Sequence, residues 1–181
     1  MVKIVAFLLL SIPVVIFSWR SLSRLTNHGF YRFLAWECIL WLTVNNITYW
    51  FRDPFCFRQI VSWIFLFYCI YPATAGAILM KRKGKTDKTR DGSLYTFEKT
   101  TELVDTGIFK TIRHPLYSSL LFLTWGIFLK HVTLYMLVFA LLSTAFLFAT
   151  ALMEERENIA FFGEKYREYR KKTKMFIPYI L

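Results

Sequence analysis

Two short stretches in the second half of the chain place titratable side chains beside long apolar segments. The first, TIRHPLYSS, covers residues 111–119 and holds Arg113 and His114 immediately before Pro115. The second, MEERE, covers residues 153–157 and follows another apolar segment. Arg and His are costly in hydrocarbon, and Pro is tolerated in a helix chiefly in its first turn. TIRHPLYSS therefore marks either the membrane boundary of a helix or a functional site.

Each of these residues also has an ordinary structural explanation. Arg113 is typical of a positively charged anchor at a membrane boundary, and Pro115 is a natural first residue of a helix. His114 would then occupy the cap position, and Glu154 and Glu155 could simply be solvated at the end of an apolar segment. Taken singly, none of them indicates an enzyme, so the argument depends on their combination.

The composition is that of a membrane protein rather than a soluble domain. The 181 residues are 56% hydrophobic, with a formal net charge of +11 and a mean hydropathy of +0.40. A helix needs about 20 residues to cross a bilayer, and the fourth of the apolar segments is shorter than that, so the last two could form a tight hairpin. We expect an all-α polytopic membrane protein with about five transmembrane helices, in the apolar segments 2–19, 31–51, 59–80, 115–129 and 132–153.

The distribution of Lys and Arg predicts the orientation. With the N-terminus outside, 19 of the 23 basic residues fall on the inner side, which is the bias seen in membrane proteins. This gives an N-out, C-in single membrane domain over residues 1–181: three spans within 1–80, a cytoplasmic loop at 81–113, and a hairpin with a C-terminal helix at 114–181. Basic runs that flank apolar segments favour a membrane partner over nucleic acid.

The residues after the last apolar segment have the spacing of a helix. Glu154, Asn158 and Phe162 follow one another at i+4, so they share a face. Gly163 is expected to interrupt this helix. The basic run at 170–174 then suits an amphipathic helix on the inner surface, with the following FIP as an apolar anchor. In the loop before Arg113, the sequence LVDTGIF turns apolar again, which predicts that it packs back toward the bilayer.

The two charged stretches should meet, because the last two apolar segments would form an antiparallel pair. Taken in order, LVDTGIFKTIRHPLY, a hairpin, EE and FGEKYREY resemble the superfamily of isoprenylcysteine carboxyl methyltransferases and phospholipid methyltransferases. That family carries L-V-x-x-G-[IV]-[YF], R-H-P-x-Y, E-E and F-G-x-x-Y-x-x-Y at similar spacing. The resemblance covers residues 101 to about 178.

The resemblance implies an enzyme that transfers a methyl group from S-adenosylmethionine, without a metal, to a lipid-like or small apolar acceptor at the cytoplasmic membrane face. The alternatives are a phospholipid amine N-methyltransferase and a non-enzymatic membrane scaffold that retains the fold. Carried over from the family motifs, the cofactor-binding residues are Leu103, Val104, Gly107, Phe109, His114, Pro115, Leu116, Tyr117 and Glu154.

Three further residues are hypotheses for the substrate side: Glu37, Thr150 and Glu155. Glu37 is a carboxylate within an apolar segment, a position that suggests either function or helix–helix hydrogen bonding. Thr150 stands where carboxyl methyltransferases of the family carry an Arg, so an amine, thiol or phenol acceptor is favoured over a carboxylate. Phe109 stands where the family usually has Tyr, which removes one hydrogen bond to the cofactor, worth about 1 kcal/mol.

Overall fold

The computed structural model describes residues 1–22, 28–83 and 102–180, and the chain is almost entirely helical within these ranges. The middle of the loop predicted at 81–113 lies outside them. The helices are α1 (Val2–Leu22), α2 (His28–Asn46), α3 (Phe57–Tyr68), α4 (Ile70–Lys83), α5 (Pro115–Phe128), α6 (Leu134–Phe162) and α7 (Glu164–Lys172), with short 3-10 turns η1 (Ile47–Tyr49) and η2 (Gly107–Lys110). The prediction of an all-helical fold is confirmed.

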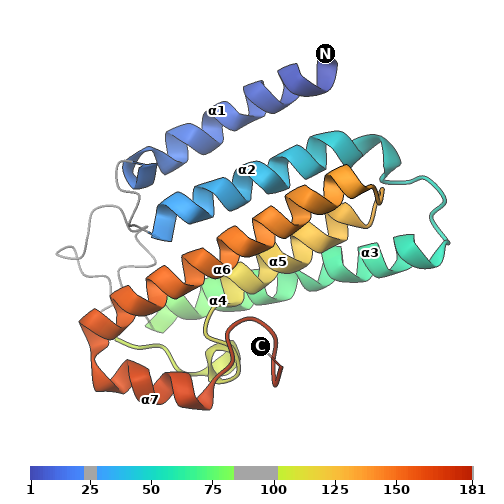
Figure 1. Cartoon of the computed structure of the whole chain (residues 1–181). Helices are drawn as coiled ribbons and strands as arrows, with labels where there is room; N and C mark the ends of the chain where they lie inside the picture. Colours follow the sequence, from blue (N-terminus) through green and yellow to red (C-terminus); the bar gives the residue numbers. More distant parts are fainter. Residues whose placement is uncertain (23–27, 84–101, 181) are drawn as a thin grey trace.

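The long helices form one bundle (Figure 1), in which α5 contacts each of α2, α3, α4 and α6. Helix α6 packs along α2 on one side and α5 on the other, while α5 also contacts α3 and α4. The core lies at these contacts, where small residues such as Ala35, Ala140 and Ala151 are fully buried and let the helices approach closely. Helix α1 packs against α2 at the edge of the bundle and exposes most of its apolar side chains.

In the described part of the chain, three helical segments are long and apolar enough to cross a membrane: residues 2–19, residues 57–83, which comprise α3 and α4, and residues 134–162. Helix α5 is apolar but shorter, as its sequence predicted. Helix α2 contains Arg32 and Glu37 and does not reach the hydropathy of the other three. Five apolar helical segments are therefore present at the predicted places, whereas the number that crosses the membrane and the orientation stay predictions.

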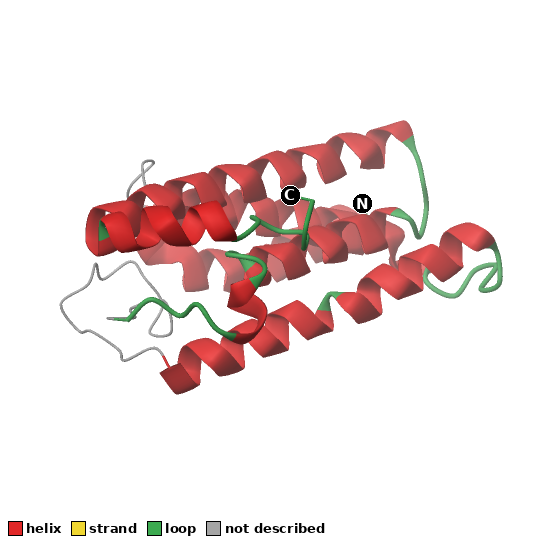
Figure 2. Ribbon diagram, turned by 90° about the horizontal axis from the view of Figure 1, so that it is seen from below, coloured by secondary structure: helices red, strands yellow, loops and turns green. Residues whose placement is uncertain are grey.

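The third of the predicted spans is broken in its middle. Helices α3 and α4 follow one another with only Cys69 between them, and Figure 2 shows this break as a short loop within a long rod. Pro72 lies in the first turn of α4 and has no N–H to donate to the carbonyl of Tyr68. The break therefore has a local cause in the sequence.

The end of the bundle where α5 turns into α6, here called the hairpin end, is closed around Lys130, which is fully buried. Its Nζ donates to Oε1 of Gln59 at 3.1 Å and lies 3.5 Å from the centre of the Trp63 ring. The guanidinium of Arg58 donates to the carbonyls of Leu129 and Lys130. Burial and the nearby charge of Arg58 lower the pKa of Lys130 from 10.5 to about 8. These contacts tie the turn to α3.

Lys130 is expected to make stability depend on pH. Between about pH 8 and pH 10.5 the unfolded chain keeps a lysine proton that the folded protein has lost, so the free energy of unfolding rises with pH in this window. Lys130→Met removes the titrating group. Thermal unfolding in detergent from about pH 7 to about pH 10 should show the wild-type melting temperature rising relative to that of the variant. A difference that does not change with pH would contradict the lowered pKa.

The segment after α7 corrects one prediction. We expected FIP, residues 176–178, to anchor the tail at the membrane surface. Instead Phe176 is fully buried within the bundle, where its ring meets that of Phe148 edge-on at 4.8 Å. The tail thus turns inward, because this aromatic side chain fills a space between α5 and α6. The interruption at Gly163 is confirmed, since this residue has φ +60° and separates α6 from α7.

Candidate functional site

The stretch around His114 is held from two sides. Pro115 begins α5 and His114 is its N-cap residue, as the sequence predicted. On the other side the backbone pairs with the tail: the N–H of Arg113 donates to the carbonyl of Lys174 at 2.8 Å, and that of His114 donates to the carbonyl of Met175 at 3.1 Å. The tail after α7 therefore fixes the position of the RHP sequence, which the spacing of the motifs alone did not predict.

The segment before this stretch packs back onto the bundle, as predicted. Ile108, Phe109 and Ile112 form a buried cluster with Leu79 and Met80 of α4. Gly107 makes the turn into η2 with φ +60°, in the left-handed region that favours glycine. The hydroxyl of Tyr169 in α7 donates to the carbonyl of Phe109 at 2.6 Å. This segment is thus fastened to α4 on one side and α7 on the other.

Eight of the nine predicted cofactor-binding residues line two adjoining recesses. Leu103, Val104, Phe109 and Glu154 line the first. The second is lined by Phe109 and Glu154 together with His114, Pro115, Leu116 and Tyr117. Because Met80, Phe109, Arg113 and Glu154 line both, the two parts adjoin each other, and together they are called the recess. The ninth residue, Gly107, lies outside the lining and shapes the turn that places Phe109.

The two adjacent glutamates have different environments. Glu154 is 24% exposed, and its Oε2 lies 3.8 Å from Nδ1 of His114, beyond hydrogen-bonding distance. Glu155 is 2% exposed and accepts from Nε of Arg113 at 2.7 Å. Its carboxylate also lies 3.0 Å from Nε of Arg170 and 3.4 Å from Nε2 of His114. Glu154 can therefore meet a ligand in the recess, whereas Glu155 joins α5, α6 and α7 internally.

His114 sits between both carboxylates and is nearly fully buried. Its ring stacks on that of Tyr117, with centroids 5.6 Å apart. The imidazole is thus fixed in orientation by the Glu155 contact at one edge and by an aromatic ring on its face. A fixed imidazole beside a partly exposed carboxylate is an arrangement that can accept or hold a proton.

Several lining residues were not among the predicted cofactor-binding residues: Met80, Asn158, Phe162, Tyr166 and Tyr169 line the recess too. Three of them, Phe162, Tyr166 and Tyr169, belong to the FGEKYREY motif. A signal for part of this set was present, because Glu154, Asn158 and Phe162 share the helix face predicted from their spacing. Burial raises the pKa of Tyr166 and Tyr169 above the ordinary value of 10.0, with the carboxylates of Glu154 and Glu155 adding to the effect at Tyr166. Both tyrosines therefore stay protonated and can donate hydrogen bonds.

The substrate-side hypotheses fall in different places. Glu37 accepts from the hydroxyl of Ser11 in α1 at 2.7 Å, and it lines neither part of the recess. Thr150 is fully buried in α6 and donates to the carbonyl of Phe146 at 2.7 Å. Glu155 forms the internal ion pairs described above. The structure thus brings none of these three side chains to the recess surface. Of the two interpretations of Glu37, its hydrogen bond to Ser11 of α1 agrees with a role in helix–helix hydrogen bonding.

Substituting Gly107 tests the turn that positions Phe109. An added Cβ would lie 2.6 Å from Cδ1 of Leu79, and an L side chain at this φ costs about 1–2 kcal/mol. Gly107→Ala is expected to lower the melting temperature and to reduce the affinity of any ligand that binds in the recess. Gly163→Ala is the matched control, because Gly163 has the same φ of +60° but nothing within 4 Å of the added Cβ. Equal effects of the two substitutions would contradict a role for the Leu79 contact.

Comparisons with known proteins identify a family and several relatives, and the family match includes this part of the chain. A family model described as phospholipid methyltransferase matches residues 75–165, from α4 to the start of α7. The chain is 38% identical over 71 residues to a methanethiol S-methyltransferase of Pseudomonas deceptionensis and 33% identical over 72 residues to methanethiol S-methyltransferase 1 of Bradyrhizobium diazoefficiens. It is 35% identical over 72 residues to a methanethiol S-methyltransferase of Crocosphaera subtropica.

These matches cover 39–40% of the chain and only 25–28% of the relatives. The similarity therefore spans about a quarter of the length of each relative. No solved structure matches the chain.

Proposed function

Because the chain belongs to the phospholipid methyltransferase family, whose model matches residues 75–165, we propose that it is an integral membrane methyltransferase. It transfers a methyl group from S-adenosylmethionine to a small apolar or lipid-like acceptor at the cytoplasmic face of the membrane. The observation that carries this proposal is the recess in which the partly exposed carboxylate of Glu154 and the ring of His114 lie beside the aromatic side chains of Phe109 and Tyr117.

The residues of the recess fit the chemistry of this cofactor. When bound, S-adenosylmethionine supplies a methyl group on a positively charged sulfur, together with a carboxylate, an amine and ribose hydroxyls. Glu154 is a suitable acceptor for hydroxyl or amine donors, since its carboxylate is not held by a short hydrogen bond. Leu116 lies in the first turn of α5, where backbone N–H groups lack an intrahelical acceptor and can bind a carboxylate.

The aromatic side chains serve the positive sulfur. A cation that lies over the face of an aromatic ring is stabilised electrostatically. Phe109 and Tyr117 both line the recess and can provide such faces. The recess is narrow, with volumes of about 60 and 40 Å³ in its two parts. We therefore expect the side chains of Met80 and Phe109 to move apart on ligand binding. The unbranched side chain of Met80 is flexible enough to allow this.

The chain's own contribution to the reaction is alignment and exclusion of water. Methyl transfer is an in-line displacement, in which correct positioning removes much of the barrier. Apolar side chains surround the recess at Val104, Phe109 and Leu116. An acceptor with a thiol or amine must also lose a proton, and the fixed imidazole of His114 with Glu154 beside it is the group placed to take it.

The nature of the acceptor follows from the charges near the recess. No additional arginine stands at position 150, where Thr150 is buried and uncharged, and Arg113 is already engaged by Glu155. Among the described residues that line the recess, a carboxylate acceptor would therefore find no free cation, so a thiol or an amine fits better. A small thiol is the leading choice, because the relatives that match this chain over 71 and 72 residues are named methanethiol S-methyltransferases. A phospholipid amine is the second candidate, in line with the description of the family.

The proposal is tested with purified protein, a labelled methyl donor and three acceptor classes: short-chain thiols, phosphatidylethanolamine and a lipid extract. Label in a thioether supports the first candidate, and label in a phospholipid headgroup supports the second. If no acceptor class is labelled and no cofactor product binds, the chain is a non-enzymatic member of its family and the proposal is wrong.

A further inference from the structure

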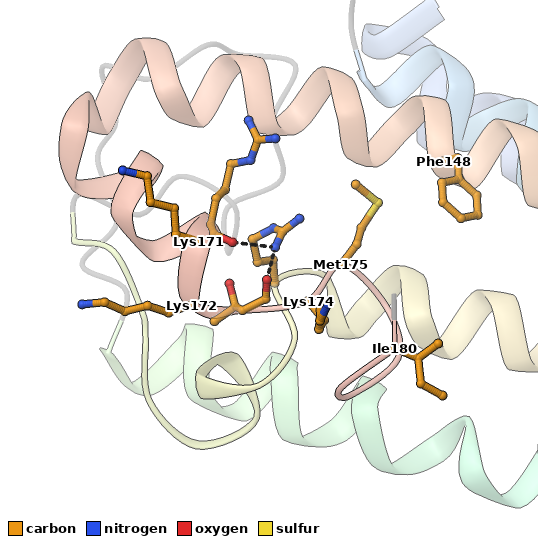
Figure 3. Close-up of a pocket in the computed structure, with 9 residues that line it drawn as sticks. Phe148, Lys171, Lys172, Lys174, Met175 and Ile180 are labelled. Carbon is orange, nitrogen blue, oxygen red and sulfur yellow. Dashed lines mark hydrogen bonds between the residues drawn. The ribbon is translucent and has the colours of Figure 1, made fainter.

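A second cavity shares the residue Arg113 with the recess. It is an open hollow of about 420 Å³, bordered by the end of α7, the tail that follows it and the flank of α6 (Figure 3). Arg113 is among the residues that line both the recess and this cavity. Neither the family motifs nor the proposed methyl transfer uses this second cavity, which we call the basic pocket.

The lining of the basic pocket carries a strong positive charge. Arg170, Lys171, Lys172 and Lys174 line it together with Arg113, and no acidic residue does. The two arginines are paired with the buried Glu155. Among the residues that the structure describes, no carboxylate pairs with any of the three lysines, which are all exposed. Within the described part of the chain, the pocket therefore offers three lysine charges without a carboxylate partner.

The opposite side of the basic pocket is apolar. Phe148, Met175 and Ile180 line this side, and Figure 3 shows the side chains of Lys171 and Lys172 projecting away from Phe148 and Ile180. Charge and apolar surface are thus separated within one cavity. This separation favours an amphiphile with an anionic head over a small, fully hydrated anion.

The apolar side continues along the outside of α6. Leu141, Ala145, Phe148 and Leu152 follow at helical spacing and share a face. Leu141 is 52% exposed and Leu152 is 47% exposed, as expected for side chains that face hydrocarbon. A chain leaving the pocket past Phe148 would therefore run along a surface suited to acyl groups.

We propose that the basic pocket binds the phosphate-bearing headgroup of an anionic phospholipid. The phosphate lies at the basic side of the pocket, beside Lys174, and the flexible side chains of Lys171 and Lys172 turn toward it from the outward positions that Figure 3 shows. The acyl chains follow the Phe148 side of α6. Since the tail that lines this pocket also pairs with the backbone of Arg113 and His114, the bound lipid holds the tail against the bundle. This inference does not depend on the methyl transfer proposal.

The test uses full-length protein in a neutral detergent. Dihexanoyl phosphatidylglycerol, dihexanoyl phosphatidylcholine, glycerol phosphate and inorganic phosphate are titrated separately, and the rise in melting temperature gives the affinity of each. Phosphatidylglycerol should bind most tightly. Replacing Lys171, Lys172 and Lys174 with Gln should weaken it on the order of 100-fold, from the typical contribution of a lysine near an anionic lipid.

A matched control removes the same charge elsewhere. Lys81→Gln, Arg82→Gln and Lys165→Gln take three exposed cations from the same end of the bundle, outside the pocket, and should leave phosphatidylglycerol affinity within about twofold. The proposal is overturned if this control loses as much affinity as the pocket variant, because binding would then depend on overall charge. Equal binding of inorganic phosphate or of phosphatidylcholine would also overturn it, since the anionic lipid would not be preferred.

Discussion

Glu155→Ala is expected to unfold the end of the bundle that carries α7. Glu155 is 2% exposed and holds Arg113 at 2.7 Å and Arg170 at 3.0 Å. Removing one member of a buried ion pair leaves the partner charge uncompensated, at a cost of about 3–5 kcal/mol. Arg170 is 43% exposed and can find water, so the lower value of about 3 kcal/mol is expected, equivalent to a drop of roughly 10 °C in melting temperature.

Thermal unfolding of the detergent-solubilised variant measures this effect. Glu155→Gln is the informative companion, because it keeps the size of the side chain and one hydrogen-bond acceptor for Arg113 while it removes the charge. It should lose less stability than Glu155→Ala. A melting temperature of Glu155→Ala within about 2 °C of wild type, less than 1 kcal/mol at this size, would show that the network does not hold the three helices together.

Glu154→Ala is expected to have the opposite profile: a large loss of methyl transfer with little loss of stability. Its carboxylate is partly exposed and makes no short ion pair, so its removal leaves no buried charge without a partner. A hydrogen bond between a carboxylate and a ligand contributes about 1.5–3 kcal/mol. Removing it should reduce kcat/KM for the methyl donor by roughly 10- to 100-fold.

Glu154→Ala and Glu155→Ala can be compared directly, because both variants delete the same type of side chain from adjacent positions of the same helix. Steady-state kinetics should show a raised KM for the methyl donor in Glu154→Ala, while its melting temperature stays close to that of wild type. If Glu154→Ala unfolds as readily as Glu155→Ala, the assignment of separate binding and structural roles to the two glutamates is wrong.

The helices of this protein follow closely from its sequence. Five apolar segments, the start of α5 at Pro115 and the interruption at Gly163 are local features, set by helix propensity and backbone geometry, and each was predicted. The inward turn of Phe176 was not, because its burial depends on a gap between α5 and α6 that only the packed bundle creates. The number of membrane crossings also does not follow from the helices, since α2 is less apolar than its neighbours.

The sequence motifs predicted which residues line the candidate site. They did not predict the contacts that depend on how the helices and the tail pack. Residues of the LVDTGIF and RHPLY sequences and Glu154 line one recess because α5 and α6 are antiparallel neighbours. The pairing of the tail with residues 111–114 joins segments about 60 residues apart, and nothing in the sequence indicated it. The distinction between Glu154 and Glu155 likewise arises from the direction each takes on α6, since their sequence context is nearly the same.

Binding of S-adenosylhomocysteine, the product of the proposed methyl donor, tests the central claim most directly. Calorimetry on the purified wild-type protein should show one site that saturates, and Glu154→Ala should weaken it at least about tenfold without changing the melting temperature. The result that contradicts our account is a folded wild-type protein that does not bind this ligand, or one that binds it as tightly after Glu154→Ala and His114→Ala as before.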